Sequence, residues 1–222
     1  RRDAGSALLK NPKLVKAILE AVTSAVKTPV TLKIRTGWDP MNRNAQEIAK
    51  IAEDTDVAAL AIHGRTRKCR FAGTAEYDTI AKVVSSVNIP VIANGDITTP
   101  QQAKSVLNET GAAGIMIGRA ALGNPWIFQH LNHYLRTNEL LPEPSITQKA
   151  DAIEKHLRTA HDFYGEISGV KIVRKHIAWY LKQYPIGRTF VRNFNTLDSS
   201  IKQRRALSDF FNSYCKIRDR AA

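Results

Sequence analysis

The chain has 222 residues, enough for one domain or two small ones, and 43% of them are hydrophobic, which is sufficient for a packed core. No run approaches the roughly 18–20 uncharged apolar residues of a membrane span, the start lacks the apolar segment of a signal peptide, and two cysteines form neither a disulfide framework nor a zinc pattern. We therefore expect a cytoplasmic protein with no metal site and no membrane partner. The net charge of +13 favours a polyanionic partner, nucleic acid above all, although it also serves as ordinary solubilising charge.

Helix and strand patterns alternate through the first 140 residues. Asn11 and Pro12 are typical of a helix start, and apolar residues follow at helical spacing up to Val26. Short apolar runs then predict buried strands over 30–35, 57–63, 90–93 and 114–117. Helices are predicted between and after them, over about 44–54, from Tyr77 to Val84, from Thr99 to Gly111, and from Asn124 onward. This alternation predicts βαβ units with a parallel sheet.

The pattern changes at a proline-rich linker, Leu141-Pro142-Glu143-Pro144, where we place a domain boundary between residues 1–140 and 141–222. Beyond it only helical patterns occur, over about 147–164, 168–183 and 199–218, which is enough for a small bundle. This segment holds 15 Lys and Arg against 8 Asp and Glu. Basic residues lie opposite an apolar stripe in its second helix, where they form either a phosphate-binding face or a solvated one.

Each predicted strand ends in polar residues suited to an anionic ligand. These are Lys33, His63, Asn94-Gly95-Asp96 and Gly118-Arg119. Active sites of (β/α) barrels lie at the carboxyl ends of their strands, and the loops after the last two strands commonly hold phosphate. We therefore predict a phosphate-bearing cofactor there. A strand-end salt bridge for Lys33, a structural role for His63 and a generic turn at Asn94-Gly95 are the alternatives.

A basic loop, residues 65–70 (RTRKCR), follows the second strand at the same rim. It is suited to substrate phosphates, or it is merely solvated. Cys69 lies among these cations, but the sequence places no base beside it, so we predict no catalytic residue within this chain.

Several of these segments together resemble the bacterial tRNA-dihydrouridine synthase family, of the B type. The resemblance rests on residues 4–9 (AGSALL), 32–38 (LKIRTGW), 62–67 (IHGRTR), 90–97 (PVIANGDI), 116–121 (MIGRAA) and 124–128 (NPWIF), and on His161, Tyr164, Arg174-Lys175-His176 and Trp179-Tyr180. It covers nearly the whole chain.

The resemblance implies an FMN-containing TIM barrel followed by a helical tRNA-binding domain. Enzymes of this family reduce the C5–C6 double bond of uridine in tRNA, with NADPH as reductant and a cysteine that protonates C5. By resemblance the flavin contacts Lys33 and His63, and its ribityl-phosphate end is held by Asn94, Gly95, Asp96, Gly118 and Arg119. Contacts to the substrate base or RNA backbone fall to Arg35, Arg65 and Arg67, and in the helical domain to Arg174 and Lys175.

The resemblance also implies that the chain is the C-terminal portion of such an enzyme, an α/β half barrel of four parallel strands plus an all-α bundle. The family's catalytic cysteine precedes the equivalent of Ala4-Gly5-Ser6, and a whole barrel has eight strands. We therefore expect the chain alone to be inactive. Its open sheet edges are expected to pair with the missing half of the barrel or with a second copy.

Two other functions remain open. One is a different FMN- or phosphate-binding barrel that acts on a small molecule, such as a dihydroorotate-dehydrogenase-like oxidoreductase, which would not need the basic helical appendage. The other is a basic RNA-binding module without catalysis. Flavin binding distinguishes the enzymes from the module, and steep salt dependence of tRNA binding distinguishes the RNA-binding proteins from the small-molecule enzyme.

Overall fold

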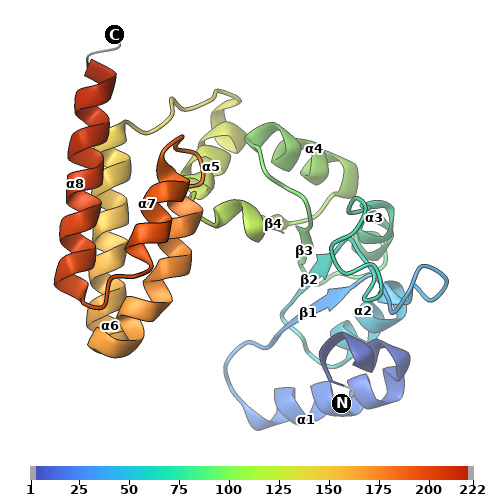
Figure 1. Ribbon diagram of the computed structural model, residues 1–222. Coiled ribbons are helices and arrows are strands. Elements are labelled where there is room, and N and C mark those ends of the chain that lie inside the picture. Colours follow the sequence, from blue (N-terminus) through green and yellow to red (C-terminus); the bar gives the residue numbers. More distant parts are fainter. Residues whose placement is uncertain (1–3, 220–222) are drawn as a thin grey trace. The chain divides into compact units, whose positions relative to one another are not determined.

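A computed structural model describes residues 4–219 of the chain, which divide into two compact units. One unit, here the barrel unit, comprises the described residues up to Ala120 together with Gln129–Glu139. The other, the helical unit, comprises Ala121–Phe128 and the described residues from Leu140 onward. Figure 1 shows both, with strands in the first and long helices in the second.

The barrel unit consists of four strands that alternate with helices. Its elements are η1 (Gly5–Lys10), α1 (Pro12–Ala25), β1 (Thr31–Arg35), α2 (Ala45–Asp54), β2 (Ala59–His63), α3 (Asp78–Val84), β3 (Val91–Asn94), α4 (Pro100–Thr110), β4 (Gly114–Met116), η2 (Arg119–Ala121, whose last residue falls to the helical unit) and α5 (Ile127–Thr137, mostly in this unit). The strands are parallel in the order β1-β2-β3-β4, which confirms the half-barrel prediction.

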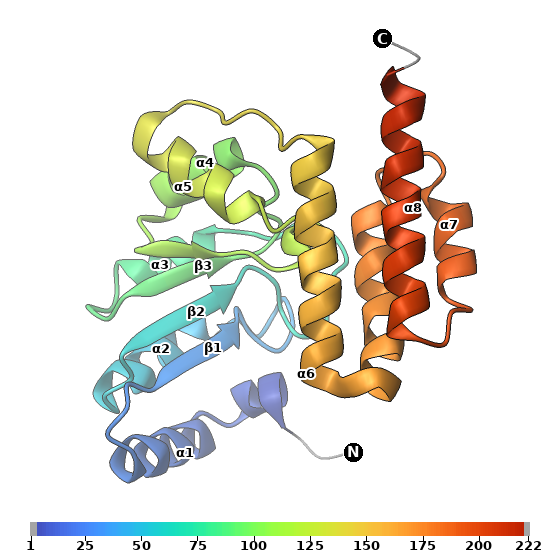
Figure 2. The ribbon, with the colours of Figure 1, turned by 90° about the vertical axis from the view of Figure 1, so that its left-hand side faces the viewer.

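The core of the barrel unit lies between the sheet and the helices that pack on it. Helices α2, α3 and α4 contact the strands and one another in sequence order (Figure 2). Leu60 and Ile62 of β2 and Ile48 of α2 are fully buried. The edge strands β1 and β4 are more exposed than β2. Apolar burial on the inner strands therefore stabilises the sheet and fixes where its carboxyl ends lie.

Helix boundaries in this unit follow the sequence signals. The side chain of Asn11 accepts a hydrogen bond from the backbone of Leu14, and Pro12 occupies the first turn of α1. Thr99 caps α4 in the same way through Gln102, and Gly111 ends that helix with φ of 66°.

The helical unit packs α6 (Ile146–Leu181), α7 (Gly187–Phe194) and α8 (Ser200–Asp219) around one apolar core. Helix α6 is broken at Gly165, where φ is 73° and ψ is 173°, a combination open essentially to glycine alone. The two halves of α6 then contribute to the same core, with Leu157 before the break and Ile177 after it. In the part of the chain that the structure describes, no helix is long and apolar enough to cross a membrane.

Three elements were not predicted from the sequence. They are the 3-10 helices η1 (Gly5–Lys10) and η2 (Arg119–Ala121) and the α-helix α7 (Gly187–Phe194). Helix α7 begins at a glycine and has only eight residues, so it lacks the long periodic pattern on which a helix prediction depends. Its formation rests on burial of Phe194 in the core of the helical unit.

Candidate functional site

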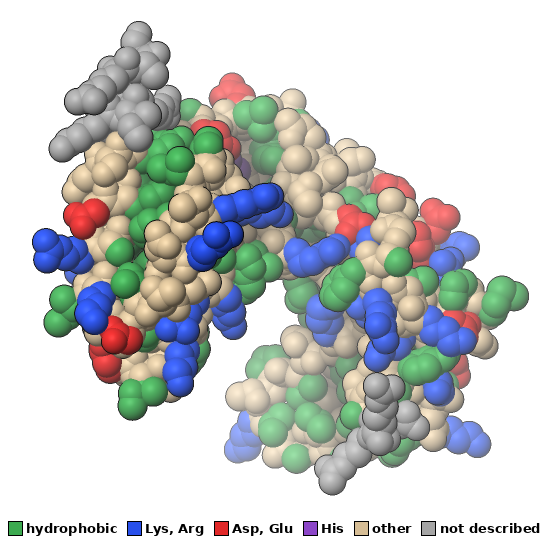
Figure 3. All heavy atoms as spheres, viewed as in Figure 1, with side chains coloured by type: hydrophobic (Ala, Val, Ile, Leu, Met, Phe, Trp, Pro, Cys, Tyr) green, Lys and Arg blue, Asp and Glu red, His purple; other side chains and the backbone are tan. Residues whose placement is uncertain are grey.

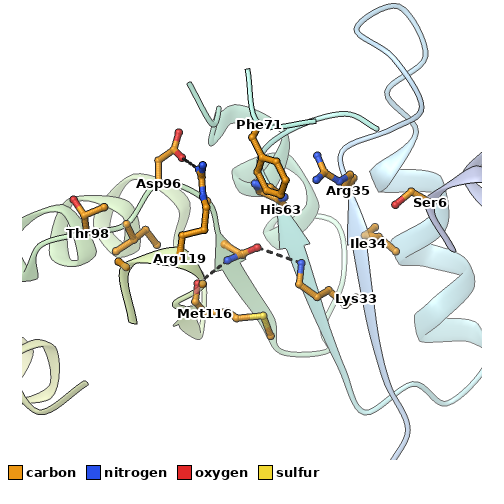
Figure 4. Close-up of a pocket in the computed structure, with 15 residues that line it drawn as sticks. Ser6, Lys33, Ile34, Arg35, His63, Phe71, Asp96, Thr98, Met116 and Arg119 are labelled. Atoms are coloured by element: carbon orange, nitrogen blue, oxygen red, sulfur yellow. Dashed lines mark hydrogen bonds and ion pairs between the residues drawn. The ribbon is translucent and has the colours of Figure 1, made fainter. Parts of the chain in front are cut away.

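The carboxyl ends of the four strands surround a cavity of about 750 Å³ in the barrel unit (Figure 4). The parallel register places Arg35 opposite His63, and His63 opposite Asn94. Every residue predicted to hold the cofactor lines this cavity: Lys33, His63, Asn94, Gly95, Asp96, Gly118 and Arg119. Side chains separated by up to 86 positions in the sequence therefore meet at one edge of the sheet.

Asn94 links three of the four strands at this edge. Its Oδ1 accepts a hydrogen bond from Nζ of Lys33 at 3.2 Å, and its Nδ2 donates to the backbone oxygen of Met116 at 2.7 Å (Figure 4). A carbonyl can only accept, so the contact with Met116 fixes the orientation of the amide and leaves its oxygen facing the lysine. Lys33 is thereby directed along the cavity floor.

His63 is buried beside cations and is neutral at physiological pH. Its pKa is lowered from 6.5 to about 4, chiefly by burial and in addition by the nearby charges of Arg35, Lys33 and Arg65. Its Nε2 lies 3.4 Å from Nη1 of Arg65, a group that always carries protons. The geometry therefore assigns the lone pair to Nε2 and the single proton to Nδ1.

Asp96 pairs with two arginines from different strand ends. Its Oδ1 and Oδ2 accept from Nη1 and Nη2 of Arg65 at 2.9 and 2.5 Å, and Oδ1 also accepts from Nη2 of Arg119 at 3.0 Å. The backbone N–H of Ala75 donates to Oδ2 at 2.8 Å. These bonds, that with Arg65 foremost, keep the pKa of Asp96 below its usual range. Asp96 therefore orders the arginines at this end of the cavity.

The placement of Arg65 argues against the RNA contact expected for it. The residue is only 4% exposed, and besides Asp96 it donates to the backbone oxygens of Ala72 and Gly73. Its guanidinium donors are thus engaged within the loop that follows β2. Arg65 holds this loop against Asp96, and its burial leaves no surface for a nucleic acid.

The two predicted glycines differ in what they require. Gly95 has φ of 131°, and a Cβ there would lie 2.7 Å from the Cβ of Ala75 and 3.1 Å from the ring of His63. Gly118 has open space where its Cβ would be, and its φ lies outside the left-handed region. Glycine is needed at 95 for the fold of the loop itself, whereas at 118 the structure leaves room that a closely approaching ligand would use.

The other expected RNA contacts have mixed surroundings. Arg35 lines the cavity and donates to the backbone oxygens of Thr66 and Arg70, and Arg67 is exposed on the loop beyond. In the helical unit Arg174 is half-buried and donates to the backbone oxygen of Leu197 at 3.1 Å. Lys175 is exposed, with Nζ 6.0 Å from the ring centre of Trp179. Arg67 and Lys175 are the members of this set with the most accessible charge.

Sequence reasoning missed Phe71 as a cavity residue. It is 59% exposed, and its ring lies between the guanidinium of Arg119, at 4.8 Å, and that of Arg35, at 5.7 Å. Both distances are those of cation–π contacts. The sequence did contain a signal for it, because Phe71 is an isolated aromatic residue directly after the basic loop, and a large apolar side chain beside so many charges needs a partner.

The charges of the cavity favour an anionic ligand. Partial burial, with Arg35 as a second cause, lowers the pKa of Lys33, and burial with Arg67 and Arg65 lowers that of Arg35. Burial is the larger cause of both shifts, and mutual repulsion of the cations adds to it. Among the described residues that line the cavity, Asp96 is the single acidic one, and it is shared by two arginines.

Neither cysteine is placed for chemistry at this cavity. Cys69 contacts the hydroxyl of Thr66 at 3.0 Å and does not line the cavity, and Cys215 belongs to the helical unit. Among residues 4–219 no group of three or more metal-ligating side chains occurs. The described part of the cavity thus provides cations, a neutral imidazole and an amide.

Comparisons with known proteins identify the family. The family model described as dihydrouridine synthase matches residues 1–214. The tRNA-dihydrouridine synthase B of Proteus vulgaris is 53% identical over 216 residues, which are 97% of this chain and 67% of that protein. The protein of the same name from Escherichia coli K12 is 52% identical over 214 residues, 96% of this chain and 67% of its own length.

The chain thus spans about two thirds of the length of these relatives. A solved mandelate oxidase structure aligns with 94% of this chain and 69% of its own, but a TM-score of 0.32 and 14% identity support no argument. The family match covers both units, the cavity and the basic helices. The chain belongs to the dihydrouridine synthase family.

Proposed function

We propose that the chain is the FMN- and tRNA-binding part of a tRNA-dihydrouridine synthase, which reduces the C5–C6 bond of uridine with NADPH as reductant. Membership of the family supports the reaction class. The observation that carries the proposal is the cavity at the strand ends, where the cations Lys33, Arg35 and Arg119 and a neutral imidazole surround space left open at Gly118.

The residues present suit FMN. Arg119 is 59% exposed in its side chain and retains donors beyond its bond to Asp96, so it suits the phosphate. Gly118 allows a close approach of the phosphate end. Lys33 and His63 lie on the floor of the cavity, where a cation and a neutral N–H suit the polar edge of the flavin ring. FMN, when bound, supplies the hydride.

The residues of this chain orient and stabilise rather than donate the proton to C5. Lys33, held by Asn94, would supply positive charge to a flavin bound in the cavity, where it would stabilise the anionic reduced form. Arg35, which lines the cavity, and Arg67, which is exposed on the loop after β2, supply cations for the RNA. Since neither cysteine lines the cavity, we propose that this chain alone does not reduce uridine and that the thiol belongs to a preceding part of the family's enzymes.

The test is an FMN titration of the purified chain, followed by flavin fluorescence. Saturable binding is expected, and both Lys33→Ala and Arg119→Ala should weaken it at least ten-fold, because each removes a charge that faces the cofactor. Lys16→Ala, which removes an exposed lysine on α1, is the matched control and should bind as the parent does. No binding by the parent, or equal binding by all variants, would refute the cofactor assignment.

The RNA part of the proposal is tested by tRNA binding at increasing salt. The expected plot of log affinity against log salt is steep, because several lysines and arginines displace counterions from phosphates. An affinity independent of salt would contradict it. Uridine reduction by this chain alone, above a control without protein, would refute the proposed inactivity.

A further inference from the structure

We propose that the helical unit carries a second base-binding site, a groove that takes one nucleotide from an unpaired stretch of the RNA substrate. This proposal rests on the proposed function. The groove, here called the aromatic groove, consists of two adjoining hollows of about 610 and 380 Å³. Glu143, Lys149 and Gln183 line both hollows; Trp126 and Trp179 line the larger, and Tyr184 and Tyr214 the smaller.

The walls of the groove are held by close backbone packing. Gly123 has φ of 74°, and a Cβ on it would collide with the backbone of Trp179 and Tyr180. The segment before α5 therefore lies directly on the last turns of α6. Trp126 packs edge to face on Tyr180, with ring centres 6.5 Å apart. Such packing orders the aromatic walls before a ligand binds, which lowers the entropy cost of binding.

The polar groups of the groove include two lysines, one glutamate and two side-chain amides. Nζ of Lys149 pairs with Glu143 at 3.2 Å, so these two charges offset each other, and Lys182 is the remaining cation among the described residues that line the groove. Lys182 is exposed and lines the larger hollow beside Trp179. Gln183 supplies an amide, which donates and accepts hydrogen bonds as a base edge does.

The chain segment that carries Lys182 is strongly basic. Residues 167–197 contain six Lys and Arg and no Asp or Glu, and this stretch includes the second half of α6 and all of α7. Figure 3 shows Lys and Arg side chains around α7 on the face in view. An apolar peptide would gain nothing from this charge, whereas a nucleic-acid strand neutralises it along its phosphates.

Aromatic rings next to cations are the combination that binds unpaired nucleotides. Bases stack on aromatic side chains while lysines hold the backbone, and a duplex cannot present its bases in this way. The larger hollow also falls within the roughly 300–1,000 Å³ typical of small-molecule sites. We therefore assign the base to the tryptophan walls and its phosphate to Lys182.

The test uses intrinsic tryptophan fluorescence in a Trp38→Phe chain, in which Trp126 and Trp179 are the remaining tryptophans. The probe is single-stranded hexauridylate, in the absence of FMN, with an abasic oligomer of the same length as the charge-only control. We expect saturable quenching by hexauridylate, and little quenching by the abasic oligomer. Equal quenching and equal affinity for the two probes would overturn the proposal.

Variants are compared by the anisotropy of labelled hexauridylate. Trp179→Leu should weaken binding at least five-fold, the lower limit for loss of one stacked base. Lys182→Gln, an exposed change that leaves the packing intact, should weaken it several-fold, against less than two-fold for the matched exposed change Lys155→Gln. Equal effects of the two lysine changes would refute the phosphate contact, and so the site.

The same variants separate this proposal from the proposed function. FMN binding depends on the barrel unit, so Lys182→Gln should titrate with FMN as the parent does. Normal FMN binding without hexauridylate quenching would overturn the groove alone. Loss of FMN binding in the parent would refute the cofactor assignment whatever the groove does.

Discussion

Replacement of Asp96 by alanine tests the ion pair at the centre of the site. Arg65 has 3% of its side chain exposed, so removal of the carboxylate leaves a buried guanidinium without counter-charge. Breaking such a pair costs about 3–5 kcal/mol, and because Asp96 is itself 31% exposed we expect a loss near the lower end, about 3 kcal/mol. The backbone N–H of Ala75 loses its acceptor in the same change.

The assay is urea unfolding of the barrel unit, followed through Trp38 in a background with Trp126→Phe and Trp179→Phe. The control is Arg119→Gln, which removes the exposed partner of the same carboxylate and should cost less than about 1 kcal/mol. If Asp96→Ala is no more destabilising than Arg119→Gln, the argument that Asp96 neutralises a buried charge is wrong.

Three further predictions concern single side chains. Between pH 6.5 and 4 the unfolded chain binds a proton at His63 that the folded chain does not. As the pH is lowered from 6.5 to 4, the free energy of unfolding of the parent should therefore decrease by up to about 3 kcal/mol more than that of His63→Asn. Urea titrations at several pH values measure this, and parallel pH dependences of the two proteins would contradict it. Gly118→Ala should leave the thermal midpoint within about 1 °C of the parent but weaken FMN at least ten-fold, and unchanged flavin titrations would show that no ligand approaches there. Gln203 is fully buried; its side chain accepts a hydrogen bond from His161 and donates one to the backbone oxygen of Val170. Gln203→Leu should therefore destabilise the helical unit by about 1–3 kcal/mol, measured by thermal unfolding. A change near zero would refute the stabilising role of these hydrogen bonds.

The strands and the members of the site were predictable from the sequence because one physical rule governs both. A strand buried on both faces is a short apolar run, and parallel strands bring their carboxyl ends to one edge. Lys33, His63 and Asn94 follow from that rule without knowledge of the loops. Strand ends shift by one or two residues, as for β2, which begins at Ala59 rather than Val57.

The partners within the site were not predictable, since they depend on loop geometry. Arg65 and Asp96 lie 31 positions apart, and nothing in either motif indicates that their side chains meet. A basic loop gives the same pattern whether its arginine faces solvent or turns inward, and here Arg65 turns inward. Helix α7 was missed for a related reason: its stability comes from Phe194 in a core assembled from distant helices, not from its own eight residues.

The break at Gly165 has a consequence for the order of folding. A single residue with positive φ turns α6 back on itself without a loop, so its two halves already meet at His161 and Gly169, eight positions apart. The strand pairs of the barrel unit instead join residues such as Thr31 and Ala59, each across an intervening helix. Local contacts form fastest because little chain entropy is lost in closing them. We therefore expect the two halves of α6 to pack against each other early in folding, before the parallel sheet has assembled.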